Sequence, residues 1–565
     1  MKKLAFLLLI VFAACKDKNE INYKVSHLTK DGTPSLHIHM EFKANSSGET
    51  VLLLQDKAWG QENLHNTLKD LKSDQASEII KEKDSNRIVI KHEKGIDKIK
   101  FSYTIQQDTE GNLTTRGTYR PVVQEKYFHA FSHNLFMIPR DYVPNSTTPF
   151  DVSIEWEGFD DDFNLVNSFD TNNRKQKITD TNERYFHSAV FTGGDYRPYI
   201  LDIKGNKAVF GIRGDWEIFQ DSTMVNVLEK TLNVQREFWK DHSQKYFAVT
   251  MTPTYLERGS SFQGSGLTNS FATSATNNKY LEPKGLVYLF NHELQHNWIG
   301  HLIKNDNEEE QYWFSEGFTD YYTIKNIAKN KIYDLDESYF ISEFNQMIKA
   351  LYTSPVKEAP NSEMTYDNFW SSRDYGKLPY RRGAIFAFYL DNKIKKDSNG
   401  EKSLDDFMLA LKEDAQKNKQ RITHSYFISK INEDVKEDVK PFFDLHIENG
   451  KLYDLESMFK EFNYEFSPTS EVFDLGFTFS EDKKSIIDID KTSNAYKAGL
   501  RKGNRVTGRS YYMGYSDYEA SITIKKGTST SSATKKEITY KFLPAKQAAI
   551  PSLIDNSDNK KTLSF

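Results

Sequence analysis

Short segments in which apolar and polar residues alternate fill the first third of the chain. Examples are 35–42, 99–105 and 150–156, and turn residues such as those at 45–48 separate them. Alternation with a period of two predicts β-strands that bury one face. We therefore expect residues 22–196 to form an N-terminal antiparallel β-sandwich.

The hydrophobic pattern changes to a helical rhythm after residue 200. Apolar side chains then recur every three or four positions, which predicts amphipathic helices. The segments with this spacing are 223–241, 283–303, 316–328, 382–395 and 404–416. Residues 197–462 should thus form a mainly helical domain with a few strands at its front.

Alternating segments return near the end of the chain, at 474–479, 486–489 and 522–525. This pattern predicts a third, smaller β-domain over residues 466–545, followed by a polar C-terminal tail over 546–565. The expected fold class is therefore a multidomain α+β protein.

Composition excludes several classes of protein. Hydrophobic residues make up 38% of the chain and aromatic residues 14%, which supplies packed cores and argues against wholesale disorder. With 75 Lys and Arg against 80 Asp and Glu, the formal net charge is −5. There is no basic field for a phosphate backbone, so we expect no nucleic-acid partner.

The first fifteen residues resemble an export signal. Two lysines precede an apolar stretch from Leu4 to Ala14, and Cys15, the only cysteine, follows directly. These features are typical of a bacterial lipoprotein signal, although an ordinary signal peptide with an incidental cysteine is the alternative. We expect residues 1–14 to be removed, Cys15 to carry a membrane lipid and residues 15–21 to form a tether. The protein would then be exported and lipid-anchored to the cell envelope, periplasmic or at the cell surface.

The segment His292-Glu-Leu-Gln-His296 carries the clearest chemistry. On a helix, residues four apart lie on one face, so both imidazoles could bind one Zn²⁺. Glu293 lies about 100° further round, where its carboxylate could reach a water molecule without being a ligand. The motif is short, but Pro283 and the apolar residues after it place it on a helix. It predicts one zinc ion, with Glu293 as general base.

A catalytic zinc site needs a third protein ligand. Ile299 and Leu302 stand where a metzincin would have its glycine and third histidine, so that class is excluded. Glu316, at the start of the next predicted helix, is the better candidate. Asp320, one turn later, could accept the second N–H of a ligating imidazole. The alternatives are a solvated glutamate at a helix start and a surface aspartate.

Two segments together resemble the gluzincin peptidases, especially the glycyl aminopeptidase-like enzymes. They are His292-Glu-Leu-Gln-His-Asn-Trp298 and Trp313-Phe-Ser-Glu-Gly-Phe-Thr319. In gluzincins the glutamate of the second segment is the third zinc ligand, which implies that role for Glu316. The resemblance also implies a thermolysin-like catalytic domain and peptide or protein substrates.

A further segment, Leu378-Pro-Tyr-Arg-Arg-Gly383, is similar to the family's tyrosine-x-lysine-glycine helix. The resemblance implies that Tyr380 hydrogen-bonds the oxyanion of the tetrahedral intermediate. Arg382 stands where the family usually has lysine. Because the chain has 31 tyrosines, a packing role for Tyr380 is the alternative.

The strand that would border the substrate departs from the family pattern. Gln263-Gly-Ser-Gly-Leu-Thr-Asn269 occupies its place, and Thr268 replaces the glutamate that binds the substrate's free α-amine. Threonine offers no charge to an amine. Either another acid substitutes, or the enzyme is not a strict aminopeptidase. The backbone of Gly266 and Leu267 could still pair with an extended substrate.

The C-terminal β-domain resembles a PDZ domain. Asp474-Leu-Gly-Phe477 is similar to the carboxylate-binding loop, and residues 494–506 to the short helix and turn before the next strand. A PDZ domain binds a chain end as an added strand, which implies a chain-end ligand. An unrelated β-domain is the alternative.

These features predict a lipid-anchored, three-domain zinc peptidase that is of aminopeptidase type by resemblance. Zinc held by the three ligands would lower the pKa of a bound water towards about 7. Glu293 would accept the proton and pass it to the leaving amine.

Two other functions stay open. Thr268 is compatible with a metallo-endopeptidase of altered specificity. A non-catalytic, surface-exposed binding lipoprotein would use the β-domain and the PDZ domain and keep zinc as a structural ion. The complete set of three ligands and a base argues against the second alternative.

Overall fold

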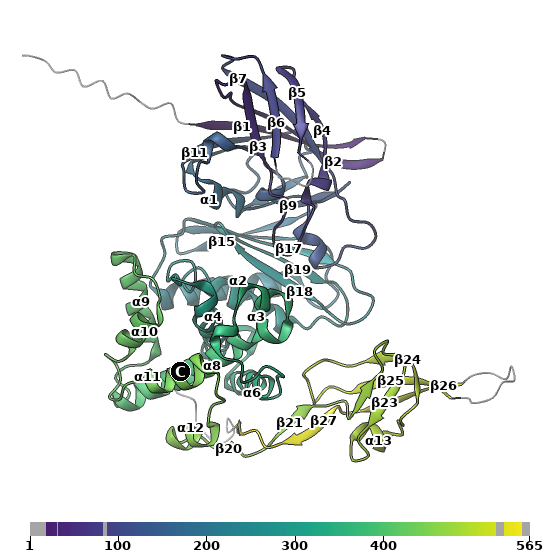
Figure 1. Cartoon of the computed structure of the whole chain (residues 1–565), viewed down its shortest axis with the longest axis vertical. Helices are drawn as coiled ribbons and strands as arrows, with labels where there is room; N and C mark the ends of the chain where they lie inside the picture. The colour runs from purple at the N-terminus through teal and green to yellow at the C-terminus, as the bar shows by residue number, and fades with distance from the viewer. Residues whose placement is uncertain (1–18, 31, 83–86, 527–535, 556–565) are drawn as a thin grey trace, which may run out of the picture. The chain divides into compact units, whose positions relative to one another are not determined.

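The computed structural model describes residues 19–30, 32–82, 87–526 and 536–555 (Figure 1). The predicted signal segment, Cys15 and the first residues of the predicted tether lie outside this part of the chain. The chain divides into two compact units, Met1–Leu294 and Gln295–Phe565. The range 197–462, expected to be one domain, is divided between them.

The largest sheet of the first unit has six strands in the order β13-β11-β1-β2-β7-β4. On β1, Ile21, Tyr23 and Val25 are buried while Lys24 is exposed, as alternation predicts. The strands are β1 (Glu20–Lys30), β2 (Thr33–Lys43), β4 (Leu68–Lys72), β7 (Lys98–Ile105), β11 (Phe150–Glu157) and β13 (Lys175–Thr181). β1 begins inside the range expected for the tether.

Two four-stranded sheets complete the N-terminal β-rich domain. Their orders are β10-β3-β6-β5 and β12-β14-β9-β8. The strands are β3 (Glu49–Leu53), β5 (Ala76–Lys81), β6 (Arg87–His92), β10 (Ile138–Pro139), β8 (Val122–Gln124), β9 (Tyr127–Phe131), β12 (Asn164–Asn167) and β14 (Val190–Gly194). One core joins the buried faces of the three sheets. The expected N-terminal β-rich domain is confirmed.

One pairing differs from the antiparallel sandwich that we expected. β1 pairs with β11 in parallel, with Glu20 opposite Asp151 and Ser26 opposite Glu157. More than a hundred residues connect these two strands, which is ample for the crossover that parallel neighbours require. Alternation of apolar residues defines a strand but not the direction of its partner.

A five-stranded sheet follows, in the order β15-β16-β17-β19-β18. The strands are β15 (Arg197–Ile203), β16 (Asn206–Ile212), β17 (Tyr246–Thr254), β18 (Phe262–Leu267) and β19 (Ser270–Thr276). β18 is an edge strand and pairs only with β19, antiparallel, among the strands that the structure describes. Helices α2 (Asp221–Trp239) and α3 (Pro283–Gln295) lie along this sheet in Figure 1.

Aromatic packing fixes α3 on the sheet. The ring of Phe290 on α3 lies edge-on to Phe210 of β16 and Phe271 of β19, with centroids 5.6 and 5.9 Å apart. Gln235 of α2 donates a hydrogen bond to the carbonyl of Asn291 at 2.8 Å. Residues 292 and 293 are therefore held in a helix that is anchored on two sides.

The second unit begins as a helical bundle. Its helices are α4 (Glu308–Ser315), α5 (Gly317–Asn330), α6 (Glu337–Tyr352), α7 (Tyr366–Ser371), α8 (Arg373–Asp397), α9 (Leu404–Asn418), α10 (His424–Ile431), α11 (Lys440–Phe443) and α12 (Leu455–Glu461). The backbones of α5 and α8 are in close contact at Gly317 and Gly383. A Cβ atom at Gly383 would lie 2.9 Å from the Cα of Gly317 and would overlap the carbonyl oxygen of Trp313. The mainly helical character expected for this region is confirmed.

The C-terminal module is small and β-rich. Its elements are β20 (Phe466–Ser467), β21 (Ser470–Phe473), β22 (Phe477–Phe479), β23 (Ile486–Ile489), α13 (Asn494–Ala498), β24 (Arg505–Ser510), β25 (Ala520–Lys526), β26 (Lys536–Phe542), β27 (Ala545–Ala548) and β28 (Ser552–Leu553). β27 and β28 pair back onto β21 and β20, inside the range expected to be a tail. The PDZ assignment stays a prediction.

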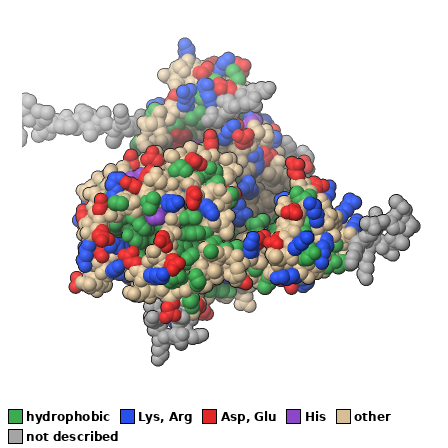
Figure 2. Space-filling view, turned by 60° about the horizontal axis from the view of Figure 1, so that its bottom comes forward, with side chains coloured by type: hydrophobic (Ala, Val, Ile, Leu, Met, Phe, Trp, Pro, Cys, Tyr) green, Lys and Arg blue, Asp and Glu red, His purple; other side chains and the backbone are tan. Residues whose placement is uncertain are grey.

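Two surface properties bear on function. Among the described residues, no helix combines the length and the apolar character that crossing a bilayer requires. Figure 2 shows acidic and basic side chains interspersed on the face in view. This mixture agrees with the small net charge of the sequence.

Candidate metal centre

His292 and Glu293 occupy the last turn of α3. Leu286, Phe290 and Leu294 of the same helix are fully buried, and this apolar stripe directs the intervening polar residues away from the core. His292 is 7% exposed and Glu293 is half-buried. The helix thus places an imidazole and a carboxylate at adjacent positions, about 100° apart round its axis.

His296 lies in a turn just beyond the end of α3. We expected the helix to continue to residue 303, but it ends at Gln295. Gly300 has a φ of 101°, a left-handed conformation that glycine adopts without strain and that does not continue a helix. The turn brings the carbonyl of Ile299 to 3.0 Å from Nδ1 of His296. That hydrogen bond fixes the ring and leaves Nε2 for another partner.

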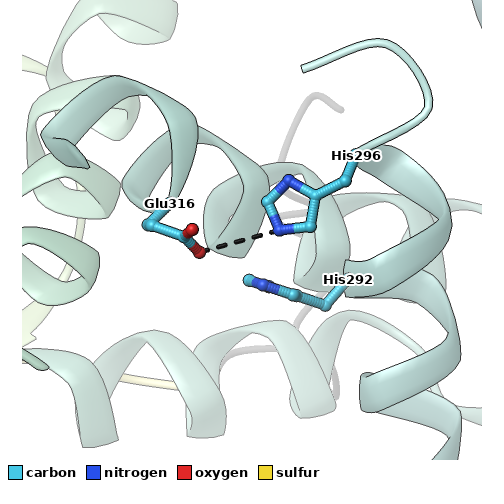
Figure 3. Close-up of side chains that lie close together, drawn as sticks. All are labelled: His292, His296 and Glu316. Atoms are coloured by element: carbon cyan, nitrogen blue, oxygen red, sulfur yellow. Dashed lines mark ion pairs between the residues drawn. The ribbon is translucent and has the colours of Figure 1, made fainter. Parts of the chain in front are cut away.

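Glu316 stands at the junction of α4 and α5, and its backbone N–H donates to the carbonyl of Tyr312 at 2.9 Å. Its Oε2 lies 3.6 Å from Nε2 of His296, and each of these side chains is 16% exposed. With His292, they offer three ligand atoms within 4.8 Å of one another. Figure 3 shows the three side chains directed toward one another. Among the described residues, no other group of three His, Cys, Asp or Glu side chains brings its ligand atoms this close together.

This donor set fits Zn²⁺. Two imidazoles and one carboxylate, with a position left open, are a known catalytic zinc environment. Ligands about 2.0–2.2 Å from a tetrahedral ion lie about 3.3–3.6 Å apart. The 3.6 Å between His296 and Glu316 agrees with that spacing. The structure therefore brings together the ligands that the sequence predicts.

Asp320 lies one turn after Glu316 on α5 and is 7% exposed, so it is not a surface charge. Its backbone N–H donates to the carbonyl of Glu316 at 2.9 Å. Because His296 already donates to Ile299, Asp320 is not needed to orient that ring. The imidazole whose second N–H Asp320 would accept is therefore that of His292. This role stays a prediction.

Tyr380 lies on α8, one turn before Gly383. Residues three apart on a helix share a face, so Tyr380 is on the side of α8 that meets Gly317, the residue after Glu316. Its ring stacks on Phe369, with centroids 6.4 Å apart, and Nζ of Lys377 lies 4.0 Å from its centre. This position suits the predicted phenol donor. Arg382, in contrast, is buried and donates to the carbonyls of Lys357 and Ala359.

The predicted substrate contacts lie at the end of β18. Gly266 and Leu267 pair with β19, and the side chain of Leu267 is buried. The Oγ1 of Thr268 donates to the carbonyl of Tyr185 at 2.6 Å, and its N–H donates to Ser188 at 2.7 Å. Thr268 is therefore engaged with the N-terminal domain. These three assignments stay predictions.

Gly264 is the residue of β18 found beside the general base. A Cβ atom there would lie 3.5 Å from Cγ of Glu293. At 3.3 Å per residue, Thr268 lies roughly 13 Å further along the chain. Sequence reasoning missed Gly264 and the carbonyl of Ile299, since neither carries a reactive side chain. The pair of Gly317 and Gly383 was missed for the same reason.

Comparisons with known proteins identify a peptidase domain in the part of the chain that contains this cluster. Residues 268–446 match the peptidase family M1 domain. Leucine aminopeptidase 2 from Ajellomyces capsulatus is 32% identical over 144 residues, which are 24% of this chain and 22% of that protein. Leucine aminopeptidase 2-2 from Meyerozyma guilliermondii is 28% identical over 166 residues, 26% of this chain and 25% of that protein. The chain thus spans about a quarter or less of the length of these relatives.

A solved structure resembles the chain over nearly its whole length. It is an aminopeptidase N family protein from Idiomarina loihiensis, with a TM-score of 0.69 and 13% sequence identity. The likeness covers 96% of this chain and 99% of that chain and shows the fold. The matched peptidase family M1 domain contains all three residues of the cluster, His292, His296 and Glu316.

Proposed function

We propose that the protein is a zinc-dependent peptidase in which His292, His296 and Glu316 hold the metal and Glu293 is the general base. The observation that carries this proposal is the approach of the three ligand atoms to within 4.8 Å of one another, beside Glu293. When bound, zinc supplies a Lewis acid that polarises the scissile carbonyl and makes water a better nucleophile at neutral pH.

The chain's own residues supply the proton transfers. The carboxylate of Glu293 accepts a proton from the attacking water and delivers it to the leaving amine nitrogen. The phenol of Tyr380 donates a hydrogen bond to the oxygen that becomes negative. The free edge of β18 holds the substrate as an added strand and orients the scissile bond.

We assign the protein to the glycyl aminopeptidase-like branch of the gluzincins, with a PDZ domain after the catalytic region. The motifs at 263–269, 378–383 and 474–477 support this finer assignment. A PDZ domain at 466–545 would bind a chain end, in addition to the peptide substrate of the catalytic site.

The environment of Thr268 favours a second candidate, a metallo-endopeptidase. Its hydroxyl donates to the carbonyl of Tyr185, and the residue is 9% exposed. A neutral, buried and engaged side chain does not offer the charge that would hold a free α-amine. A peptidase without that charge would also accept substrates whose N-terminus is blocked.

One experiment separates the candidates. Hydrolysis of matched peptides with free and N-acetylated ends is measured on the zinc-loaded protein, with and without a chelator. A strict aminopeptidase cleaves only the free peptides, whereas an endopeptidase cleaves both. In either case the chelator abolishes cleavage and added zinc restores it. A protein that cleaves neither set of a broad library would contradict the proposal and support a non-catalytic binding lipoprotein.

We also propose that Cys15 carries a lipid that anchors the protein to the cell envelope. The lysines, the apolar stretch and the small residues before Cys15 support this. Radiolabelled palmitate should be incorporated into the wild-type protein, and the Cys15→Ala variant should lose both the label and the membrane fraction. Unchanged membrane association of that variant would overturn the proposal.

A further inference from the structure

A short turn of the N-terminal domain is fixed against one side of the edge strand β18. The turn is the 3₁₀ helix η2 (Arg116–Tyr119). Gln263 of β18 donates to the carbonyl of Thr115, and Ser265 donates to the phenol oxygen of Tyr119 at 3.3 Å. Residues two apart on a strand face the same side, so both bonds hold the turn to one side of β18.

Gly264, between them, faces the opposite side, where the general base lies. A Cβ atom there would overlap the ring of Phe271 and lie 3.5 Å from Cγ of Glu293. An extended peptide that adds to β18 near Gly264 therefore has its scissile bond close to Glu293. The residues around Gly264 then determine what the bound peptide touches.

Tyr119 lies on the other side of β18, where its phenol is bonded to Ser265, the residue after Gly264. Burial raises the pKa of its phenol, and the negative charge of Glu293 raises that pKa further, whereas Ser265 and Arg116 lower it. The phenol thus lies within electrostatic reach of the general base. Because Ser265 is the donor in their hydrogen bond, Tyr119 keeps its own O–H for another acceptor.

Trp59 extends the aromatic surface from Tyr119 to the solvent. The two ring centroids are 5.6 Å apart, and Trp59 lies edge-on to Phe131 at 4.6 Å. The indole is 39% exposed, although Phe131 beneath it is buried. An aromatic ring that is supported on one side and exposed on the other is available to a ligand.

The backbone at Trp59 is strained. Ala58 and Gln61 exchange hydrogen bonds of 3.1 and 2.8 Å, so Trp59 and Gly60 form a two-residue turn. Their φ angles are 49° and 72°, a conformation that such turns normally fill with Asn, Asp or Gly. Bulky residues rarely adopt it, and strain of this kind concentrates at functional sites.

We propose that Trp59 and Tyr119 form an aromatic wall that selects peptides with a large apolar, preferably aromatic, side chain next to the scissile bond. This inference rests on the proposed peptidase function. The position that would bind an α-amine through charge holds the engaged Thr268 instead. The preferred peptides would thus be those whose apolar side chain stacks on Trp59, while the phenol of Tyr119 lies beside the peptide backbone.

The test compares kcat/KM for two peptides that differ only in Phe or Ala on the N-terminal side of the scissile bond. The wild type should prefer the Phe peptide by about tenfold or more. Trp59→Ala should reduce this ratio by about tenfold at equal zinc content, and Trp59→Phe should largely restore it. Tyr333→Ala is the matched control, since Tyr333 is also exposed (38%) and has a φ of 58°. It should leave the ratio unchanged.

A binding measurement separates this inference from the proposed function. The Kd values of the two peptides are measured with Glu293→Gln and with the double variant Glu293→Gln/Trp59→Ala. Tighter binding of the Phe peptide that is lost in the Trp59→Ala variant would support the aromatic wall. Failure of the wild type to hydrolyse any peptide would overturn the proposed function and leave the aromatic wall standing. Equal Kd values for the two peptides, or a preference that survives Trp59→Ala, would overturn the wall.

Discussion

The backbones of Gly317 and Gly383 meet where α5 crosses α8. A Cβ atom at Gly317 would overlap the Cα of Gly383, and one at Gly383 would lie 2.9 Å from the Cα of Gly317. Glu316 precedes the first glycine, and Tyr380 lies one turn before the second. This contact therefore sets the position of a metal ligand relative to the proposed oxyanion donor.

Gly383→Ala should disturb the metal centre without changing any ligand. The added methyl overlaps the carbonyl of Trp313 and must push α8 away from the segment that carries Glu316. We expect a loss of about 1–3 kcal/mol in the free energy of unfolding, together with weaker zinc binding. Denaturant titration and zinc titration measure these effects.

The neighbouring Ala384→Gly is the control for that experiment. It removes a buried methyl group from the same helix and should cost about 1–2 kcal/mol, through helix propensity and lost packing. Zinc affinity should then stay at the wild-type value. Equal zinc affinities in Gly383→Ala and the wild type would show that the glycine contact does not position Glu316.

Glu293→Gln should bind one zinc ion per chain and lose nearly all turnover. The amide has the shape of the carboxylate but cannot accept the proton, and general base catalysis contributes about 10²–10⁴-fold. Zinc is measured by elemental analysis and turnover on the best peptide. Glu310→Gln, an exposed change on α4, is the control and should retain wild-type values. A zinc-loaded Glu293→Gln with an undiminished rate would remove Glu293 from the mechanism.

Tyr380→Phe should lower kcat by about 10²–10³, with zinc content unchanged, because it removes one donor to the oxyanion. Tyr389 on the same helix provides the matched control. It lies nine positions after Tyr380, which places it about 180° round the helix. Its ring stacks on Phe442 at 3.8 Å. Equal kcat values for the two phenylalanine variants would assign Tyr380 to packing alone.

Two buried histidines, His129 and His133, and the half-buried His187 should make the N-terminal domain sensitive to acid. Burial lowers the pKa of His129 to about 4, of His133 to about 3 and of His187 to about 4. In the unfolded chain the pKa of each would be about 6.5. Below that pH the unfolded chain binds protons that the folded domain does not, so stability falls as the pH drops toward 4.

Between about pH 6.5 and pH 4, each of these histidines should lower the free energy of unfolding by up to about 1.4 kcal/mol for each pH unit. Hydrogen exchange of β9, which carries His129, measures the local free energy of opening at pH 7, 6 and 5 after correction for intrinsic rates. Replacement of His133 by glutamine should reduce the number of protons taken up on opening by about one. The free energy of opening should then fall less steeply as the pH drops. Protection that is constant from pH 7 to 5 would contradict this account.

The cluster of candidate metal ligands could be predicted from the sequence because its pattern is local. His292 and His296 lie four residues apart, and Glu316 belongs to a second short motif, so spacing and residue type were enough. The β-rich domain was predictable for a similar reason, since alternation along a strand reports its buried face. The structure brings all three ligands together.

The features that were missed depend on contacts between distant segments. The parallel pairing of β1 with β11 and the return of β28 to β20 leave no periodic signal in either partner. The meeting of Gly317 with Gly383 involves residues without side chains. The approach of Tyr119 to β18 joins segments 146 residues apart. Such relationships follow from the packing of the whole fold and become visible only in three dimensions.

The central claim is that one divalent ion is held by His292, His296 and Glu316. An anomalous difference map collected at the zinc edge from crystals of the zinc-replete protein tests it directly. The account predicts a single strong peak about 2 Å from a nitrogen of each histidine and an oxygen of Glu316. A map without a peak among these side chains, or with Glu316 turned away from it, would contradict the account.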